Sequence, residues 1–162
     1  MSEITKEILD RMIDGRSSWE ELVAVMRADK EPDRFAKYRE VLQERATWRD
    51  RILLPIALHL CIVQKDDGAR VVKCDCGHEF GDYRRNWKLS ARVRVRNTKA
   101  GIDELYPHPM GCNPEWMELR EYFCPGCYTQ LDVEAVPPGY PVVFNFLPDL
   151  EAFYAEWLGE KI

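Results

Sequence analysis

The first fifty residues carry apolar side chains at helical spacing. In residues 3–14 they recur every three or four positions, which predicts an amphipathic helix that ends at Gly15. Ser18 is followed three residues later by Glu21, a capping-box pattern that predicts the start of a second short helix. A third helix is expected over residues 31–45, where apolar positions again share one face. The N-terminal part is therefore predicted to be a group of short helices.

The pattern changes to that of strands after residue 51. Residues 52–64 are largely apolar and end in β-forming side chains, residues 65–68 have the composition of a hairpin turn, and 70–73 are expected to form the return strand. In residues 91–96 valines alternate with arginines. Because successive side chains of a strand point to opposite faces, this predicts a half-buried strand with its arginines outward.

The last third combines loops, two strands and one helix. Residues 99–115 are rich in proline and glycine and are expected to form a loop. Two short strands are predicted at 122–123 and 130–136, on either side of a Cys-Pro-Gly-Cys sequence. A final helix is predicted over 150–158, with Asp149 as its N-cap.

The cysteines give the sharpest chemical signal. Cys74 and Cys76 form one pair, and Cys124 and Cys127 form a second pair further along the chain. Two pairs of thiolates at strand turns satisfy the tetrahedral preference of Zn²⁺, so we expect a closed, structural zinc site of the zinc-ribbon kind. The first pair is one residue shorter than the usual spacing, and His78 follows it, so His78 in place of Cys74 or Cys76 is an alternative ligand set. A redox role for the Cys-x-x-Cys pair and inert buried cysteines are the competing interpretations.

These elements predict an α+β fold. It consists of N-terminal short helices, a central antiparallel β-sheet with a zinc-ribbon-like metal site, and a C-terminal helix. We expect an N-terminal helical region over 1–50, a zinc-ribbon-like β domain over 51–147 and the C-terminal helix over 148–162, together forming one compact unit.

Composition and charge exclude several classes of protein. The 162 residues include no long uninterrupted apolar stretch, so no transmembrane helix is expected. The N-terminus lacks the pattern of a signal peptide, which favours the cytoplasm. No nucleotide-binding loop, nucleophile elbow or zinc-protease motif is present, so no catalytic residue is assigned. Cys61 is expected to be a core thiol, Cys112 an exposed thiol in a loop, and His59 a histidine of an apolar strand.

The net charge of −5 is unevenly distributed. Residues 84–99 hold seven basic and no acidic residues, whereas residues 100–162 hold two basic and eleven acidic ones, a net of −9. Bands of opposite sign suit docking between protein surfaces, and Arg92, Arg94 and Arg96 are our candidates for contact with a partner. The alternative is a free-standing zinc-ribbon module that binds nucleic acid through residues 84–99.

Many short blocks of the sequence resemble one known family. They extend from about residue 5 to residue 159, and include Asp33-Arg34-Phe35, Leu54-Pro55, Ile62-Val63-Gln64, Cys74-x-Cys76-Gly77-His78, Asn86-Trp87-Lys88-Leu89, Ala91-Arg92-Val93, Arg120-Glu121-Tyr122-Phe123-Cys124-Pro125-x-Cys127, Asp132-Val133-Glu134-Ala135 and Phe153-Tyr154-x-Glu156-Trp157-Leu158-Gly159. Together they resemble the small (gamma) subunits of bacterial acetone carboxylases and the equivalent subunits of related ketone carboxylases, such as acetophenone carboxylase.

The resemblance implies a role within a larger enzyme. The family's enzymes are multi-subunit ligases that use ATP to join bicarbonate to a ketone, which gives a β-keto acid. ATP and a divalent metal are expected on the larger, hydantoinase-related subunits of the hetero-oligomer. The small subunit is expected to bind structural zinc, to brace its partners and to contribute no catalytic group. The short Cys74-x-Cys76 spacing belongs to the family's pattern.

Overall fold

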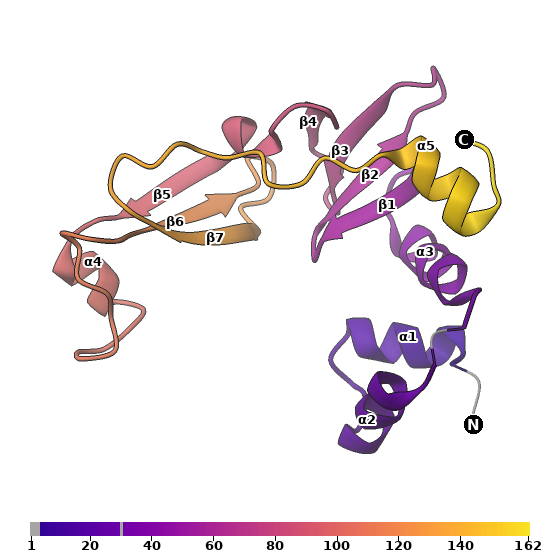
Figure 1. The fold of residues 1–162 in the computed structure, drawn as a ribbon, viewed down its shortest axis with the longest axis horizontal. Helices are drawn as coiled ribbons and strands as arrows, with labels where there is room; N and C mark the ends of the chain where they lie inside the picture. The colour runs from indigo at the N-terminus through magenta and orange to yellow at the C-terminus, as the bar shows by residue number, and fades with distance from the viewer. Residues whose placement is uncertain (1–3, 30) are drawn as a thin grey trace. The chain divides into compact units, whose positions relative to one another are not determined.

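The computed structural model describes residues 4–29 and 31–162. The described part of the chain forms two compact units, which divide after Gly77. The helices, shown in Figure 1, are α1 (Lys6–Ile13), α2 (Trp19–Arg27), α3 (Arg34–Arg45), η1 (Trp87–Ser90), α4 (Lys99–Asp103), α5 (Leu150–Ala152) and η2 (Phe153–Leu158). The strands are β1 (Arg51–Ala57), β2 (Leu60–Gln64), β3 (Arg70–Cys74), β4 (Glu79–Asp82), β5 (Arg92–Arg96), β6 (Glu118–Phe123) and β7 (Gln130–Val136). The predicted combination of N-terminal helices, antiparallel sheet and C-terminal helix is confirmed.

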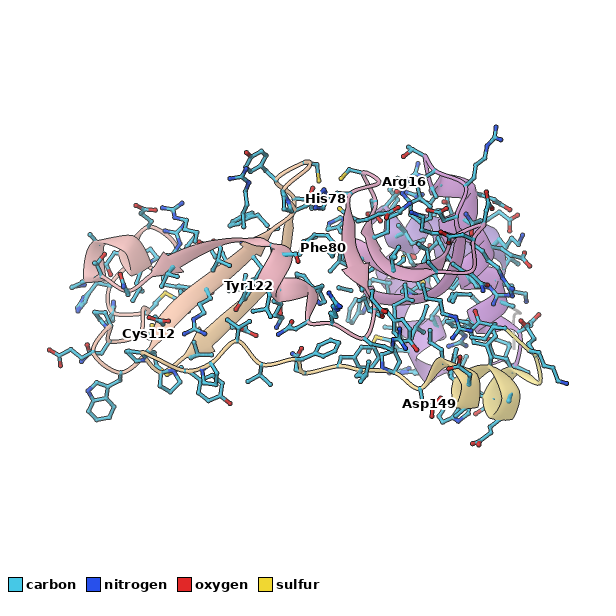
Figure 2. The ribbon with its side chains drawn as sticks, turned by 90° about the horizontal axis from the view of Figure 1, so that it is seen from above. Arg16, His78, Phe80, Cys112, Tyr122 and Asp149 are labelled. Carbon is cyan, nitrogen blue, oxygen red and sulfur yellow. The ribbon has the colours of Figure 1, made fainter. Side chains whose placement is uncertain are left out.

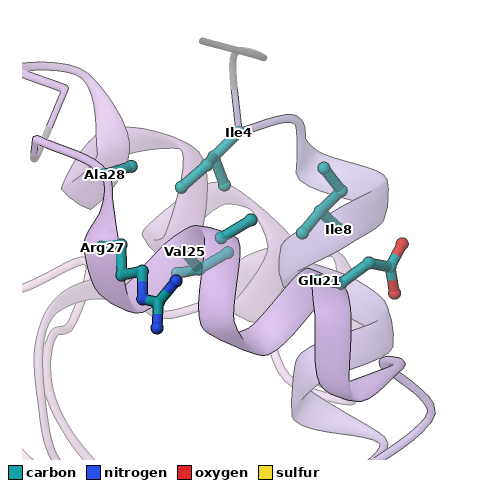
Figure 3. Close-up of a pocket in the computed structure, with 7 residues that line it drawn as sticks. Ile4, Ile8, Glu21, Val25, Arg27 and Ala28 are labelled. Carbon is teal, nitrogen blue, oxygen red and sulfur yellow. The ribbon is translucent and has the colours of Figure 1, made fainter.

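The N-terminal helices pack around a small apolar cluster. The predicted capping box is formed: Ser18 Oγ accepts a hydrogen bond from the Glu21 N–H at 3.2 Å, and Glu21 Oε2 accepts one from the Ser18 N–H at 3.1 Å. The buried members of the cluster come from the start of the chain, α1 and α3: Ile4, Leu9 and Val41. A pocket of about 300 Å³ lies between α1 and α2, with mainly aliphatic walls (Figure 3). The expected start of the first helix at residue 3 lies outside the described residues.

Three antiparallel strands follow in the order β1-β2-β3. The predicted turn before β3 is confirmed, since the Gly68 N–H donates to the Lys65 carbonyl at 2.9 Å with Gly68 at φ +83°. The single apolar segment expected over 52–64 is instead a hairpin, because residues 58 and 59 form a turn between β1 and β2. His59 therefore lies in a turn rather than in a strand.

The second unit contains the sheet β5-β6-β7, which is antiparallel throughout. Its central strand β6 is buried along almost its whole length. Aromatic rings follow one another edge to face beside this sheet, with centroid distances of 5.0 Å from His78 to Phe80, 5.8 Å from Phe80 to Trp87 and 6.1 Å from Trp87 to Tyr122 (Figure 2). These contacts join the segment that follows the first cysteine pair to β6.

Two details of the second unit differ from the expected elements. The helix α4 occupies the start of the segment expected to be a loop, because Thr98 Oγ1 accepts a hydrogen bond from the Gly101 N–H at 3.1 Å and Ile102 is buried. The C-terminal helix begins as expected, with Asp149 Oδ1 accepting from the Ala152 N–H at 3.0 Å, and continues as the π-helix η2. Gly159, at φ +66°, ends it.

None of the helices in the described part of the chain has the length and apolar character needed to cross a membrane.

Candidate metal centre

The first cysteine pair lies at the end of β3. Cys74 is the last residue of the strand and is buried, whereas Cys76 is exposed in the turn that follows. Gly77 closes this turn, because its N–H donates to the Cys74 carbonyl at 2.8 Å. Its φ of +91° lies in the region that favours glycine, so the tight Cys-x-Cys-Gly turn depends on this residue type.

Trp48 and His59 hold Asp75, the residue between the two cysteines. His59 Nδ1 lies 2.9 Å from Asp75 Oδ2, and the Asp75 N–H donates to the His59 carbonyl at 3.2 Å. Trp48 Nε1 donates to the Asp75 carbonyl at 3.1 Å. The turn therefore has three polar attachments to the residues around it. The sequence did not indicate this role for His59 and Trp48, since neither is close to Asp75 along the chain.

The second cysteine pair forms the connection between β6 and β7. The Gly126 N–H donates to Cys124 Sγ at 3.4 Å, and Cys127 Sγ lies 3.2 Å from Thr129 Oγ1. The Cys124 N–H donates to the Thr129 carbonyl and the Tyr128 N–H donates to the Cys124 carbonyl, both at 2.9 Å. A backbone N–H directed at sulfur stabilises a thiolate, so the hydrogen bond from Gly126 suits Cys124 as a metal ligand.

The four predicted ligands come together. The sulfur atoms of Cys74, Cys76, Cys124 and Cys127 all lie within 4.8 Å of one another. A tetrahedral site with Zn–S bonds of ~2.3 Å places its sulfurs about 3.8 Å apart. The separation and the all-sulfur donor set therefore fit a metal ion of the zinc class.

His78, the alternative ligand, lies outside this group of four. Its ring packs edge to face against Phe80, with the centroids 5.0 Å apart (Figure 2). The contact places His78 at the start of the row of aromatic rings that leads to β6.

The two remaining cysteines belong to other environments. Cys61 is buried in β2, and burial raises the pKa of its thiol to about 12, so it stays protonated at neutral pH. Cys112 is half-buried, and its Sγ lies 3.8 Å from the Met117 carbonyl. Cys61 is therefore the core thiol that the sequence predicted.

Carboxylates of the same unit neutralise most of the basic band. Five of its seven cations form ion pairs: Arg84 with Asp82, Lys88 with Asp132 and Glu134, Arg94 with Glu104, Arg96 with Glu104 and Glu121, and Lys99 with Asp103. The charge that this band presents to solvent is therefore much smaller than the sequence alone indicates.

The three arginines proposed for partner contact differ in their surroundings. Arg96 is buried, with its Nε 2.5 Å from Glu121 Oε2. Arg94 is 53% exposed and pairs with Glu104 at 2.7 Å. The Arg92 guanidinium lies over the ring of Tyr128, 5.3 Å from its centroid. Arg92 and Arg94 thus remain accessible, whereas Arg96 is used inside the fold.

Comparison with known proteins identifies the family. The model of the acetone carboxylase gamma subunit family matches residues 46–158. The chain is 47% identical to the acetone carboxylase gamma subunit of Xanthobacter autotrophicus over 160 residues, which cover 98% of this chain and 95% of that protein. It is also 26% identical over 83 residues to the acetophenone carboxylase beta subunit of Aromatoleum aromaticum, which covers 50% of this chain and 64% of that protein. The chain belongs to the acetone carboxylase gamma subunit family.

Proposed function

We propose that this chain is the zinc-binding structural subunit of a multi-subunit, ATP-dependent ketone carboxylase and takes no direct part in catalysis. The observation that carries the proposal is the 47% identity to an acetone carboxylase gamma subunit over nearly the whole of both chains. The complete enzyme would join a ketone to bicarbonate to give a β-keto acid. ATP and a divalent metal would then be held by larger, hydantoinase-related subunits in a cytoplasmic hetero-oligomer.

We assign one Zn²⁺ to Cys74, Cys76, Cys124 and Cys127. Four thiolates complete a tetrahedral shell, which leaves no position for a water or a substrate, so the metal would hold the fold rather than activate a reactant. His78 is left out of the shell because its ring nitrogens do not belong to the group of ligand atoms that lie within 4.8 Å of one another. Each pair supplies one buried and one exposed sulfur, and the N–H of Gly126 supports Cys124 from outside the shell.

The ion pairs of residues 84–99 argue against the nucleic-acid alternative. Binding to a phosphate backbone requires cations that are free to neutralise phosphates. Five of the seven cations in this band already face carboxylates of the same chain, so phosphate contacts would have to break existing pairs. We therefore retain the carboxylase assignment.

The assembly carrying this chain tests the proposal directly. The chain would be tagged, purified gently from its own cells and analysed by native mass spectrometry, with metal content measured on the same sample. The expected result is a complex with two or more larger chains, about one zinc per copy of this chain and ATP-dependent carboxylation of a ketone. Recovery of the 19.0 kDa chain alone, or with nucleic acid, would overturn the assignment.

The His59–Asp75 pair offers a test of the non-catalytic role. In an enzyme where this pair moved a proton, its loss would lower kcat by about 10²–10⁴-fold. We expect His59→Asn, which keeps a donor near Asp75, to leave kcat of the zinc-loaded complex within about twofold of wild type. A large loss of kcat with full zinc content would mean that this chain contributes to the chemistry.

A further inference from the structure

The strand β5 leaves one edge of its sheet open. The strand order is β5-β6-β7, so β5 pairs with β6 on one side, and no described strand pairs with its other side. Val93 and Val95 of this strand are each 45% exposed. An open edge with aliphatic side chains attracts a further strand, and soluble proteins usually cover or blunt it.

The pairing register separates the side chains of β5 into two kinds. Val93 lies opposite Tyr122 and Val95 opposite Arg120, so the two valines share one face of the sheet. Arg92 and Arg94 project to the other face, because side chains alternate along a strand. The open edge is therefore aliphatic on one face and cationic on the other.

We propose that β5 receives an extended strand from a different chain, in which carboxylate and aliphatic side chains alternate. Its aliphatic residues would lie beside Val93 and Val95, and a carboxylate would lie beside Arg92. The Arg92 guanidinium lies over the Tyr128 ring and forms no ion pair with the described residues, while Arg94 keeps its pair with Glu104. Main-chain hydrogen bonds would supply affinity and the alternating side chains would supply specificity. The inference rests on the proposed function, since it places one contact through which this subunit would brace a larger one.

Charge argues against a second copy of this chain as the occupant. Pairing β5 with itself in an antiparallel register centred on Arg94 sets the exposed Arg94 side chains of the two copies directly opposite each other. Like charges directly opposite each other across a strand pair are destabilising. A strand of opposite charge relieves this repulsion, which is why we commit to a different, acidic chain.

The second cysteine pair positions the first residue of this edge. Arg92 lies over the ring of Tyr128, which follows Cys127 directly and has φ +61°. Arg92 also pairs across the strands with Phe123, the residue before Cys124. The β6–β7 knuckle and the start of β5 are thus held together, so an ordered knuckle gives an ordered edge.

A matched pair of variants tests the edge in the complete complex. Val93→Lys adds one charge to the aliphatic side of β5 at a 45% exposed valine, while Val133→Lys makes the same change at a 44% exposed valine on β7, the other outer strand. We expect the β5 variant to lower the recovery of this chain with its partners by about tenfold and the β7 control to lower it less than twofold. Zinc content and circular dichroism of each variant verify its fold. Equal recovery of both folded variants would overturn the proposal.

Hydrogen exchange in the wild-type complex gives an independent answer. In an open edge strand, alternate amides face solvent and exchange quickly, whereas a strand paired on both sides protects all of them. We expect every amide of residues 93–96 to be protected in the complex. Fast exchange at alternate residues would overturn the β5 proposal even though the complex forms, whereas failure of the wild-type chain to assemble at all would overturn the proposed function.

A photo-crosslinking residue at Val93 identifies the occupant. Capture of an acidic, extended segment from a larger subunit supports the proposal. Capture of β5 from a second copy would show self-pairing and contradict it.

Discussion

The two antiparallel sheets of this chain are stabilised by different kinds of side chain. In the first unit, the central strand β2 begins with four consecutive buried residues, Leu60 to Val63, none of which carries a charge. In the second unit, the central strand β6 buries Glu118, Arg120 and Glu121. Of the buried charged side chains in the described residues, Lys73 lies in the first unit, and the other five lie in the second: Lys88, Arg96, Glu118, Arg120 and Glu121.

The aliphatic core of the first sheet and the buried ion pairs of the second stabilise the fold in different ways. Aliphatic burial is non-directional and stabilises any arrangement that removes enough apolar surface from water. A buried ion pair has a large desolvation cost, so it is tolerated only where partners and geometry match. The buried ion pairs of the second sheet therefore allow fewer arrangements of the neighbouring elements than the aliphatic core of the first sheet does. Arg96 links β5 to β6 through Glu121, and Lys88 links η1 to β7 through Asp132 and Glu134.

The largest expected effect is loss of the zinc ion that we assign to the two cysteine pairs. We expect Cys76→Ser and Cys124→Ser each to abolish zinc binding and stable folding, because structural zinc contributes on the order of 10 kcal/mol and its binding is coupled to folding. The measurement is zinc per chain together with circular dichroism. Cys112→Ser is the matched control and should keep both. A soluble, fully folded Cys124→Ser chain without metal would contradict the structural assignment.

The second prediction removes the cation at the centre of a buried network. Lys88 is 2% exposed, lies 2.7 Å from Asp132 and also pairs with Glu134. Lys88→Met leaves two carboxylates without their cation, which should lower the free energy of unfolding by about 3–5 kcal/mol. Denaturant unfolding of the zinc-loaded chain measures this.

A compensated variant separates lost charge from lost packing. Adding Asp132→Asn and Glu134→Gln to Lys88→Met removes the unpaired charges, so we expect it to recover most of the stability. No recovery would mean that Lys88 acts through the contact of its ammonium group with the rings of Trp87 and Tyr122.

The corresponding change in the first unit removes aliphatic volume. Leu53 is fully buried in β1, and we expect Leu53→Ala to lower the free energy of unfolding by about 2–5 kcal/mol through lost burial and a residual cavity. Leu53→Met should lower it by less than about 1.5 kcal/mol, because volume is conserved. A larger loss for Leu53→Met than for Leu53→Ala would show that shape, rather than apolar volume, controls this sheet.

The same contrast explains which elements the sequence could predict. The helices and the β3 hairpin follow from apolar periodicity and turn residues, and the Ser18–Glu21 capping box formed as its spacing indicated. The β1–β2 hairpin was not predicted. The segment stays largely apolar through the turn, so its hydrophobic pattern does not mark where one strand ends and the next begins. The short helix α4 was also missed, since the burial of Ile102 is a tertiary effect.

The metal site was more predictable than its supports. The spacing of the four cysteines in two pairs predicted a common metal site, and their sulfur atoms lie within 4.8 Å of one another. The roles of His59 and Trp48 depend on contacts across the fold, and so does the burial of Arg96, which the alternation in β5 had predicted to point to solvent. The sequence around a cationic residue in a strand does not show whether a carboxylate of another strand lies opposite it in the fold.

A pH series tests Glu134, a half-buried carboxylate that pairs with the buried Lys88. Burial raises the pKa of Glu134, whereas hydrogen bonds from Lys88 and Tyr122 lower it by a larger amount. The pKa of Glu134 therefore lies below its ordinary value of 4.5. Its contribution is therefore complete above pH 4.5 and is lost as pH falls through the lower folded value. We expect Glu134→Gln to reduce the free energy of unfolding by about 1.5–3 kcal/mol at neutral pH, and the gap from wild type to close in acid. Zinc release in acid affects both proteins alike, so the difference isolates Glu134; a gap that widened in acid would contradict the assignment.

The smallest effect is expected at an ion pair that is well formed but exposed. Arg84 donates from Nε and Nη2 to the two oxygens of Asp82 at 3.0 and 2.6 Å, and these hydrogen bonds lower the pKa of Asp82 to about 2. The Arg84 side chain is nevertheless 68% exposed, so water and salt screen the pair. We expect the unfolding midpoint of Arg84→Gln to lie within error of wild type, although the pair is bidentate and that of Lys88 is not. If Arg84→Gln instead destabilised the chain as much as Lys88→Met, geometry rather than burial would govern these ion pairs, and the contrast between the two sheets would need another cause.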